Sequence, residues 1–158
     1  MMHYDISHEH EDYERRFPHA MIETLVGRVC EELGLETGEI SLSFVSDASM
    51  EQLNGTFRNR FESTDILSFV QSDGEDDFPM MLDDQSMGPP LGDLVICPEA
   101  MDRNCIDFSV TPEEELLRLI THGVLHLLGW EHETNDVDEP MLQKQEQLVS
   151  IIAKESHS

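Results

Sequence analysis

Basic residues are scarce in this sequence. Nine lysines and arginines stand against 34 aspartates and glutamates among 158 residues, which gives a formal net charge of −25. This balance argues against a broad basic surface for nucleic acid, because such surfaces bind through many phosphate contacts. It leaves room for a local positive site made of a metal ion and a few arginines. Solubility, or adaptation to a salty or acidic medium, would explain the charge without any ligand.

Cysteines and long apolar runs are also few. The three cysteines are widely spaced and include no C-x-x-C pair, so we expect reduced, buried thiols rather than a disulfide framework. No run approaches the roughly 18 to 20 apolar residues of a membrane span. Residues 1–17 lack the basic and apolar regions of a secretory signal. These features predict a cytoplasmic protein without a membrane segment, and the length predicts a single domain over residues 1–158.

The hydrophobic pattern predicts an α+β fold in which a small mixed four-stranded sheet is packed with about five helices. Alternating or short apolar stretches predict strands at residues 3–7, 39–46, 64–70 and 91–97, the first of them at an edge. Apolar residues three and four positions apart predict helices at 19–34, 48–58, 112–128 and 139–154. Residues 71–90 are acidic and aperiodic, which predicts one long loop.

Residues with particular backbone preferences predict where several helices begin or end. Asp47 is the expected N-cap of the second predicted helix. Thr111, followed by a proline and by Glu114, predicts a capped helix start with a capping box. Gly34 and Gly129 are expected to end the first and third helices, because glycine favours the left-handed conformation found there.

The most informative pattern is a group of histidines in the stretch THGVLHLLGWEH. His122 and His126 are four residues apart on a helix that is apolar on more than one face, so both project from one side of a central helix. After Gly129 breaks that helix, the chain can fold back and bring His132 to the same point. Three imidazoles with an open fourth position are typical of catalytic zinc, and they also suit nickel. Hydrogen-bonded core histidines are the alternative.

The same stretch has the spacing of a protease zinc site. Metzincin proteases use H-E-x-x-H-x-x-G-x-x-H, and the histidines and Gly129 match it. However, Gly123 stands where those proteases keep the glutamate that takes a proton from zinc-bound water. Peptide hydrolysis by that mechanism is therefore not expected. The reaction should be one in which the metal and its water suffice, or in which another group moves the proton.

Three blocks of the sequence resemble the YbeY-type single-strand-specific endoribonucleases of bacteria, also described as rRNA maturation factors. HGVLHLLGWEH resembles the family pattern H-G-x-L-H-L-x-G-[YWH]-D-H, with Glu131 in place of the usual aspartate. LNGTFRNRFESTDILSF, residues 53–69, resembles L-N-x-x-[YWF]-R-x-x-x-x-x-T-D-V-L-S-F, and LGDLVICPEA, residues 91–100, resembles the G-D-I-x-I segment. The order and spacing of the blocks agree, although the acidic loop at 71–90 looks longer than is typical of the family.

The resemblance implies a zinc-dependent endoribonuclease that processes the ends of small-subunit rRNA and acts in ribosome quality control. It implies one zinc ion on His122, His126 and His132, with Arg58 close to the metal. Arg58 and His122 are thus the predicted catalytic residues. The implied partners are single-stranded ribosomal RNA, a small-subunit ribosomal protein and an Era-type GTPase.

Two other functions stay open at this point: a metal-dependent hydrolase of another substrate, and a non-catalytic ribosome-assembly factor with a structural metal. Arg58 could equally be a cation that interacts with a helix dipole. Arg60 and Arg103 are weaker candidates for phosphate contacts. Asp65 and Asp93 either bond to local backbone or orient a zinc-bound imidazole, since a ligating histidine usually donates its other N–H to an acceptor.

Overall fold

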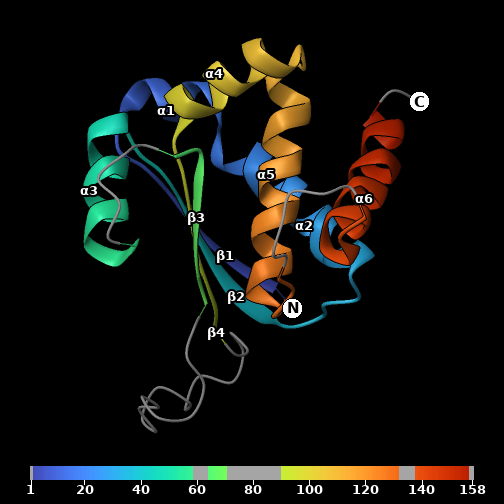
Figure 1. Cartoon of the computed structure of the whole chain (residues 1–158). Coiled ribbons are helices and arrows are strands. Elements are labelled where there is room, and N and C mark those ends of the chain that lie inside the picture. The colour runs from blue at the N-terminus through green and yellow to red at the C-terminus, as the bar shows by residue number, and fades with distance from the viewer. Residues whose placement is uncertain (1, 59–63, 71–89, 132–137, 157–158) are drawn as a thin grey trace, which may run out of the picture.

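A mixed sheet with helices on both faces organises the computed structural model (Figure 1). The structure describes residues 2–58, 64–70, 90–131 and 138–156. In chain order the elements are β1 (Met2–His8), α1 (Glu11–Arg16), α2 (His19–Glu32), β2 (Gly38–Phe44), α3 (Asp47–Arg58), β3 (Ile66–Val70), β4 (Pro90–Ile96), α4 (Pro98–Phe108), α5 (Pro112–Leu127) and α6 (Pro140–Ser156). The predicted α+β class with a four-stranded mixed sheet is confirmed.

The strand order is β1-β2-β4-β3, so β1 is an edge strand as predicted. Strands β1, β2 and β4 run parallel, whereas β3 is antiparallel to β4 and pairs from Ile66 with Ile96 to Val70 with Gly92. Side chains along β2 alternate between buried and half-buried, in step with the alternation of apolar residues and serines in its sequence. The predicted loop at 71–90 lies outside the described residues, except that Pro90 begins β4.

The two faces of the sheet pack against different helices. Leu94 and Ile96 belong to a large core with residues of α2 and α5, whereas Val95, between them, packs in a smaller cluster with Met50 of α3. Helix α5 contacts β3 and β4 on one side and α6 on the other, which makes it the central helix of its layer (Figure 1). Its burial agrees with the prediction of a helix that is apolar on several faces.

Most of the predicted helix ends are confirmed. The Thr111 hydroxyl accepts a hydrogen bond from the backbone N–H of Glu114 at 3.2 Å, as an N-cap does. Gly34 and Gly129 have φ values of 76° and 96° and follow α2 and α5. At Gly129 two bonds of the Schellman motif close the helix, from Gly129 N–H to the His126 carbonyl and from Trp130 N–H to the Leu125 carbonyl.

The prediction of Asp47 as the cap of α3 was wrong. The Ser46 hydroxyl accepts from the backbone N–H of Ser49 at 3.2 Å, so Ser46 is the cap and Asp47 is the first helical residue. The Asp47 carboxylate is instead held by Arg103 of α4. Serine and aspartate are both good caps, so residue type alone does not distinguish these two adjacent candidates.

Two helices escaped the sequence analysis. Helix α1 has 6 residues, too few to show a helical period. Helix α4 buries Pro98, Met101 and Cys105 on one side, but it also carries Ile106 and Phe108 on its surface, 79% and 70% exposed, which obscures its apolar stripe in the sequence. All three cysteines are free and buried, as expected. Across the described ranges, no helix combines the length and the apolar character that crossing a membrane requires.

Candidate metal centre

Helix α5 brings His122 and His126 together on its half-buried side. Their ring centroids are 4.6 Å apart, with the planes at 78°. The two Nε2 atoms face one another at 3.1 Å. This arrangement follows from the four-residue spacing, because residues one turn apart share a helix face. The predicted convergence of these two imidazoles is therefore present in the structure.

The Nδ1 atoms of both rings are engaged elsewhere. His122 Nδ1 lies 2.7 Å from the amide oxygen of Gln145, and His126 Nδ1 lies 3.0 Å from the carbonyl oxygen of Trp130. Both partner atoms are acceptors only, so each Nδ1 carries the hydrogen and donates it. In a neutral imidazole the other nitrogen then has a lone pair. Two Nε2 lone pairs are thus turned toward the same space.

This donor set fits one metal ion. At 3.1 Å the two Nε2 atoms are close enough to share a proton or to bind one cation together. Zinc–nitrogen bonds of roughly 2.0 to 2.1 Å, meeting at a tetrahedral angle, place two nitrogens about 3.3 Å apart. A ligating histidine also normally donates its other N–H to a carbonyl or carboxylate. His132, the third predicted ligand, lies outside the described residues, so the complete ligand set stays a prediction.

Gly129 has a second consequence beyond ending α5. The Schellman turn reverses the chain so that the Trp130 carbonyl, four residues after His126, reaches back to the ring of that histidine. The helix stop and the orientation of the second imidazole are therefore parts of one local structure. A glycine in the helix-ending position signals the turn, but the hydrogen bond becomes visible only in three dimensions.

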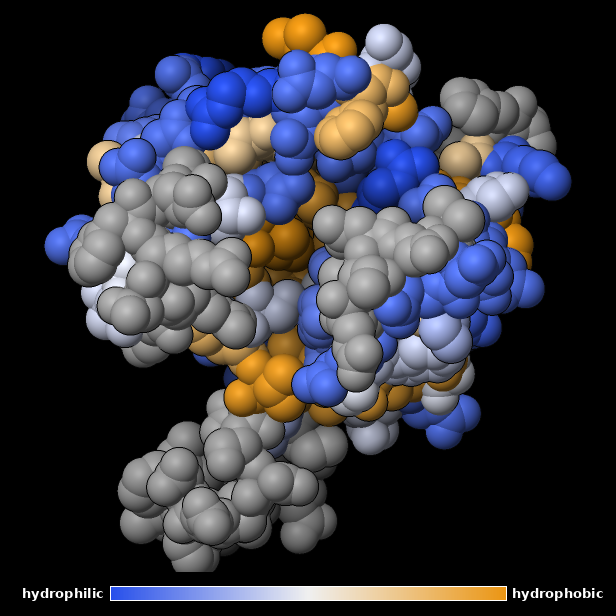
Figure 2. Space-filling view, in the orientation of Figure 1, coloured by the Kyte–Doolittle hydropathy of each residue, from blue (hydrophilic) through white to orange (hydrophobic). Residues whose placement is uncertain are grey.

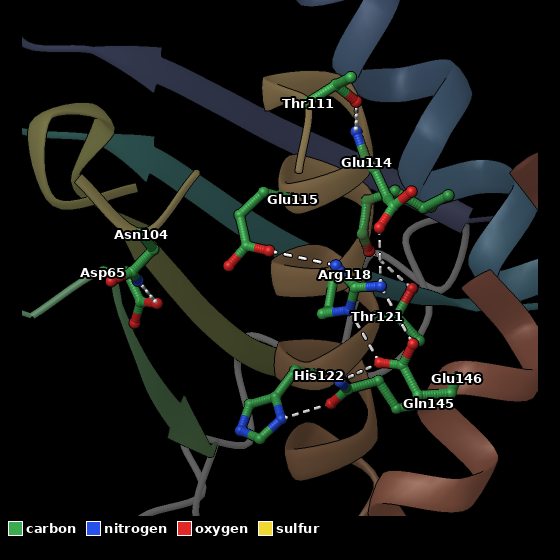
Figure 3. Close-up of polar contacts among 11 residues, drawn as sticks. Asp65, Asn104, Thr111, Glu114, Glu115, Arg118, Thr121, His122, Gln145 and Glu146 are labelled. Carbon is green, nitrogen blue, oxygen red and sulfur yellow. Dashed lines mark hydrogen bonds and ion pairs between the residues drawn. The ribbon is translucent and has the colours of Figure 1, made fainter. Parts of the chain in front are cut away.

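Gln145 is the residue of this site that the sequence analysis missed. Its amide oxygen accepts from His122 Nδ1, and it comes from α6, 23 residues along the chain (Figure 3). One signal was available: Gln145 lies four residues from both Met141 and Val149 on the apolar face of its helix. A polar side chain on an apolar stripe needs a hydrogen-bond partner in the core.

The structure supports the first of the two roles predicted for Asp65, a bond to local backbone. Its carboxylate accepts from the backbone N–H of Ile66 and from the Asn104 amide at 2.7 Å, and burial raises its pKa. Asp93 is exposed on β4 beside Leu94, and alternation along the strand turns it to the sheet face opposite α5. The structure assigns the acceptor for His122 to Gln145 in their place.

Gly123 packs against the sheet. A Cβ atom at this position would lie 2.6 Å from Leu94 Cδ2 and 3.1 Å from Ile66 Cδ1, both closer than ordinary van der Waals contact. The residue after His122 thus faces the β-strands, where a glutamate side chain has no room. The contacts with Leu94 and Ile66 thus give a structural reason for a glycine at this position.

Of the three predicted arginines, the structure describes the side chain of Arg103 alone. Helix α3 ends at Arg58, whose side chain lies outside the described part of the chain, as does Arg60. Arg103 donates through both terminal nitrogens to the Asp47 carboxylate, at 3.0 and 2.8 Å. A guanidinium engaged in this bidentate pair is a structural link between α3 and α4. The prediction that Arg103 contacts phosphate is therefore not supported.

A second group of potential metal ligands lies at the starts of α3 and α4. One ligand atom from each of Asp47, Cys97 and Glu99 falls within 4.8 Å of the others. Donors already serve the carboxylates: Arg103 binds Asp47, and the Tyr13 hydroxyl donates to Glu99 at 2.6 Å. The guanidinium supplies the positive charge that a metal would otherwise bring. We interpret this group as a structural link and not as a cofactor site.

An apolar recess opens in the middle of the face shown in Figure 2, over the region where β3 and α5 lie side by side in Figure 1. His122 projects from α5 on the side nearer β3 and Asp65 in the close-up of Figure 3. The surface at this region is thus concave and apolar, with polar side chains at its border. Such a site suits a ligand that is held by a few polar groups.

The fold and the paired imidazoles define the class of this protein: an α+β protein with a candidate metal site on its central helix. The family model described as Endoribonuclease YbeY matches residues 4–153, and the chain belongs to this family. The resemblance seen in the three sequence blocks is confirmed.

The chain is similar to relatives from several bacteria. It is 38% identical to Endoribonuclease YbeY of Treponema denticola, over 81% of this chain and 79% of the relative. It is 38% identical to that of Heliobacterium modesticaldum, over 71% and 69%. The solution structure of TM1509 from Thermotoga maritima superposes with a TM-score of 0.61 at 28% identity, covering 98% of this chain and 91% of that one.

Proposed function

We propose that this chain is a zinc-dependent, single-strand-specific endoribonuclease of one domain over residues 1–158. It would act in the cytoplasm on the ends of small-subunit rRNA and in ribosome quality control. The observation that carries the proposal is the pair of Nε2 atoms 3.1 Å apart, each on a ring whose Nδ1 is occupied by an acceptor. Family membership supports the substrate class, because the relatives are named endoribonucleases. A small-subunit ribosomal protein and an Era-type GTPase are the proposed partners.

The proposed chemistry divides between the ion and the side chains. His122, His126 and His132 would hold zinc, which when bound supplies a Lewis acid for a phosphate oxygen and lowers the pKa of bound water. Gln145 and the Trp130 carbonyl keep two of these rings in the required orientation. Arg58 would bind the scissile phosphate through its planar fork and stabilise the charge that develops there. RNA brings its own 2′-hydroxyl nucleophile, so a protease-type glutamate is not required.

Replacing Arg58 by alanine should slow the cleavage of single-stranded RNA by about 10²- to 10³-fold, the usual effect of losing one group that stabilises transition-state charge. The zinc content should stay that of the wild type, because Arg58 is not a ligand. Single-turnover cleavage and metal analysis measure the two quantities. Arg15→Ala is the matched control, since Arg15 is 70% exposed and pairs with Glu11 and Asp12.

The Arg58 variant also separates the proposed enzyme from an assembly factor with a structural metal. If zinc-loaded Arg58→Ala cleaves RNA at the wild-type rate, Arg58 has no catalytic role. If the wild-type protein shows no cleavage while the variant still supports ribosome maturation, the non-catalytic alternative is correct.

Few arginines are available for additional phosphate contacts. Those with described side chains are each in an ion pair with a carboxylate: Arg15, Arg16, Arg28, Arg103 and Arg118. We therefore predict a shallow salt dependence of RNA binding, with log K falling against log [salt] at a slope of about −2, as for roughly three phosphates on a single strand. Titration of zinc-loaded protein with a 2′-O-methyl RNA, which resists cleavage, measures it. A slope near −5 would require a broad basic surface and contradict this prediction.

A further inference from the structure

Gln145 is buried at the contact between α5 and α6. Its side chain is 7% exposed, and its amide oxygen lies 2.7 Å from His122 Nδ1. An amide in the core keeps its position only if its polar atoms find partners. The oxygen has the histidine, and the nitrogen donates to the Glu146 carboxylate at 2.9 Å. The residue thus links a carboxylate on its own helix to an imidazole on the neighbouring helix (Figure 3).

The orientation of this amide is fixed by charge. Glu146 accepts from Arg118 through both oxygens, at 2.8 Å from Nε and 3.0 Å from Nη2. The guanidinium holds the pKa of the Glu146 carboxyl below its usual range, so this group is ionised and can only accept hydrogen bonds. The amide must therefore turn its NH₂ group toward Glu146. Its oxygen is then left for His122.

Arg118 ties this arrangement to α5 itself. It lies four residues before His122, one turn earlier on the same helix, and both side chains bond to residues of α6. Its guanidinium also binds Glu114 and Glu115 at 3.0 and 3.2 Å, which fixes it on its own helix (Figure 3). The hydrogen-bonded chain from Arg118 through Glu146 and Gln145 to His122 therefore has both of its ends on α5.

The imidazole at the end of this chain has two neutral tautomers. Only the form with its hydrogen on Nδ1 presents a lone pair at Nε2, the atom that faces His126. An acceptor at Nδ1 stabilises that form and keeps the ring from rotating. From this geometry we propose that Gln145 is a positioning residue for the metal centre, holding His122 with Nε2 ready to bind the ion. The proposal rests on the proposed function in that it takes His122 to be a ligand.

Gln145→Leu removes the acceptor with little change of volume. In the metal-free protein, ¹⁵N NMR of the assigned His122 ring should show the Nδ1–H tautomer in the wild type and a mixture with Nε2–H in the variant. The zinc dissociation constant, from competition with a chelator at fixed pH, should rise by about 10- to 100-fold, as for other groups that orient a ligand. The matched control is Gln147→Leu, the same replacement at an exposed position of α6.

Two further variants distinguish the positioning of His122 from a purely structural role of Gln145. Gln145→Glu keeps an acceptor for Nδ1, so it should bind zinc more tightly than Gln145→Leu does. Gln145→Met, of similar length, replaces the leucine variant if that protein does not fold. A structural role alone would lower the thermal stability of these variants equally and leave the tautomer unchanged.

The results that overturn this inference differ from those that overturn the proposed function. If Gln145→Leu has the wild-type tautomer and a zinc affinity within about twofold of the wild type, Gln145 does not position the ligand. If the wild-type protein cleaves no RNA, or binds no zinc, the proposed function fails. If zinc binds but no RNA is cleaved, a His122 tautomer and a zinc affinity that depend on Gln145 still support the positioning role. If no zinc binds, both proposals fail.

Discussion

Replacing His126 by alanine should leave a protein that no longer binds one zinc ion per chain and that cleaves single-stranded RNA at least about 10³-fold more slowly. His126 supplies one of two Nε2 atoms that face one another at 3.1 Å, and its ring is fixed by the Trp130 carbonyl. A catalytic ion contributes several kcal/mol of transition-state stabilisation, and each 1.36 kcal/mol is about tenfold in rate. The loss should therefore resemble that of the wild type after chelation.

Two comparisons make this result specific. Adding zinc back should restore the chelated wild type but not the variant. His19→Ala is the matched control, because His19 is exposed on α2 and pairs with Glu23. Full-rate cleavage by the His126 variant would contradict the metal centre. Turnover of a peptide or ester by zinc-loaded wild type, lost on changing His122, would instead favour the alternative of a hydrolase with another substrate.

The parts of this structure that were predictable are those that depend on local chemistry. The helix ends marked by Thr111, Gly34 and Gly129 depend on contacts with residues close by in the chain, so the sequence is enough to predict them. The four-residue spacing of His122 and His126 likewise settles that they share a helix face. Each inference needs only one turn of helix or one reversal of the chain.

What could not be predicted depends on contacts between elements. Ser46 caps α3, while Asp47 pairs with Arg103, which comes from a different helix. The acceptor for His122 is on α6, and nothing near His122 in the sequence points to Gln145. Asp65 was the more obvious acceptor by residue type, but Asn104 binds it. Ion pairs and hydrogen bonds between distant residues have no sequence period, so pattern analysis does not find them.

Gly123 shows how such a contact changes the interpretation of a motif. Beside the protease pattern, its missing side chain looks like a lost catalytic base. In the structure it packs against the sheet, with the side chains of Leu94 and Ile66 against the helix backbone. A larger residue there would have to displace the ends of the Leu94 and Ile66 side chains. The spacing of the two histidines suits a metal ion, whereas the glycine between them is explained by its packing against the sheet.

Gly123→Ala should therefore lower the free energy of unfolding by about 1 to 3 kcal/mol, the usual cost of adding a methyl group to a filled core. Gly123→Glu should cost more, because it also buries a charge without a partner, and it should gain no peptidase activity. Chemical denaturation of the metal-free proteins measures the stabilities, and a peptide assay with zinc tests the activity.

The matched control is Gly27→Ala in α2, where a Cβ would meet only the Tyr4 hydroxyl at an ordinary 3.8 Å. There the alanine should stabilise the protein by about 0.5 to 1 kcal/mol, because glycine is unfavourable inside a helix. If alanine lowers the free energy of unfolding at position 123 and raises it at position 27, then the close approach to Leu94, and not helix propensity, determines the residue at 123. A Gly123→Ala protein as stable as the wild type would contradict the packing explanation. Peptide hydrolysis by Gly123→Glu would mean that position 123 can reach the substrate, and the protease interpretation of the histidine motif would return.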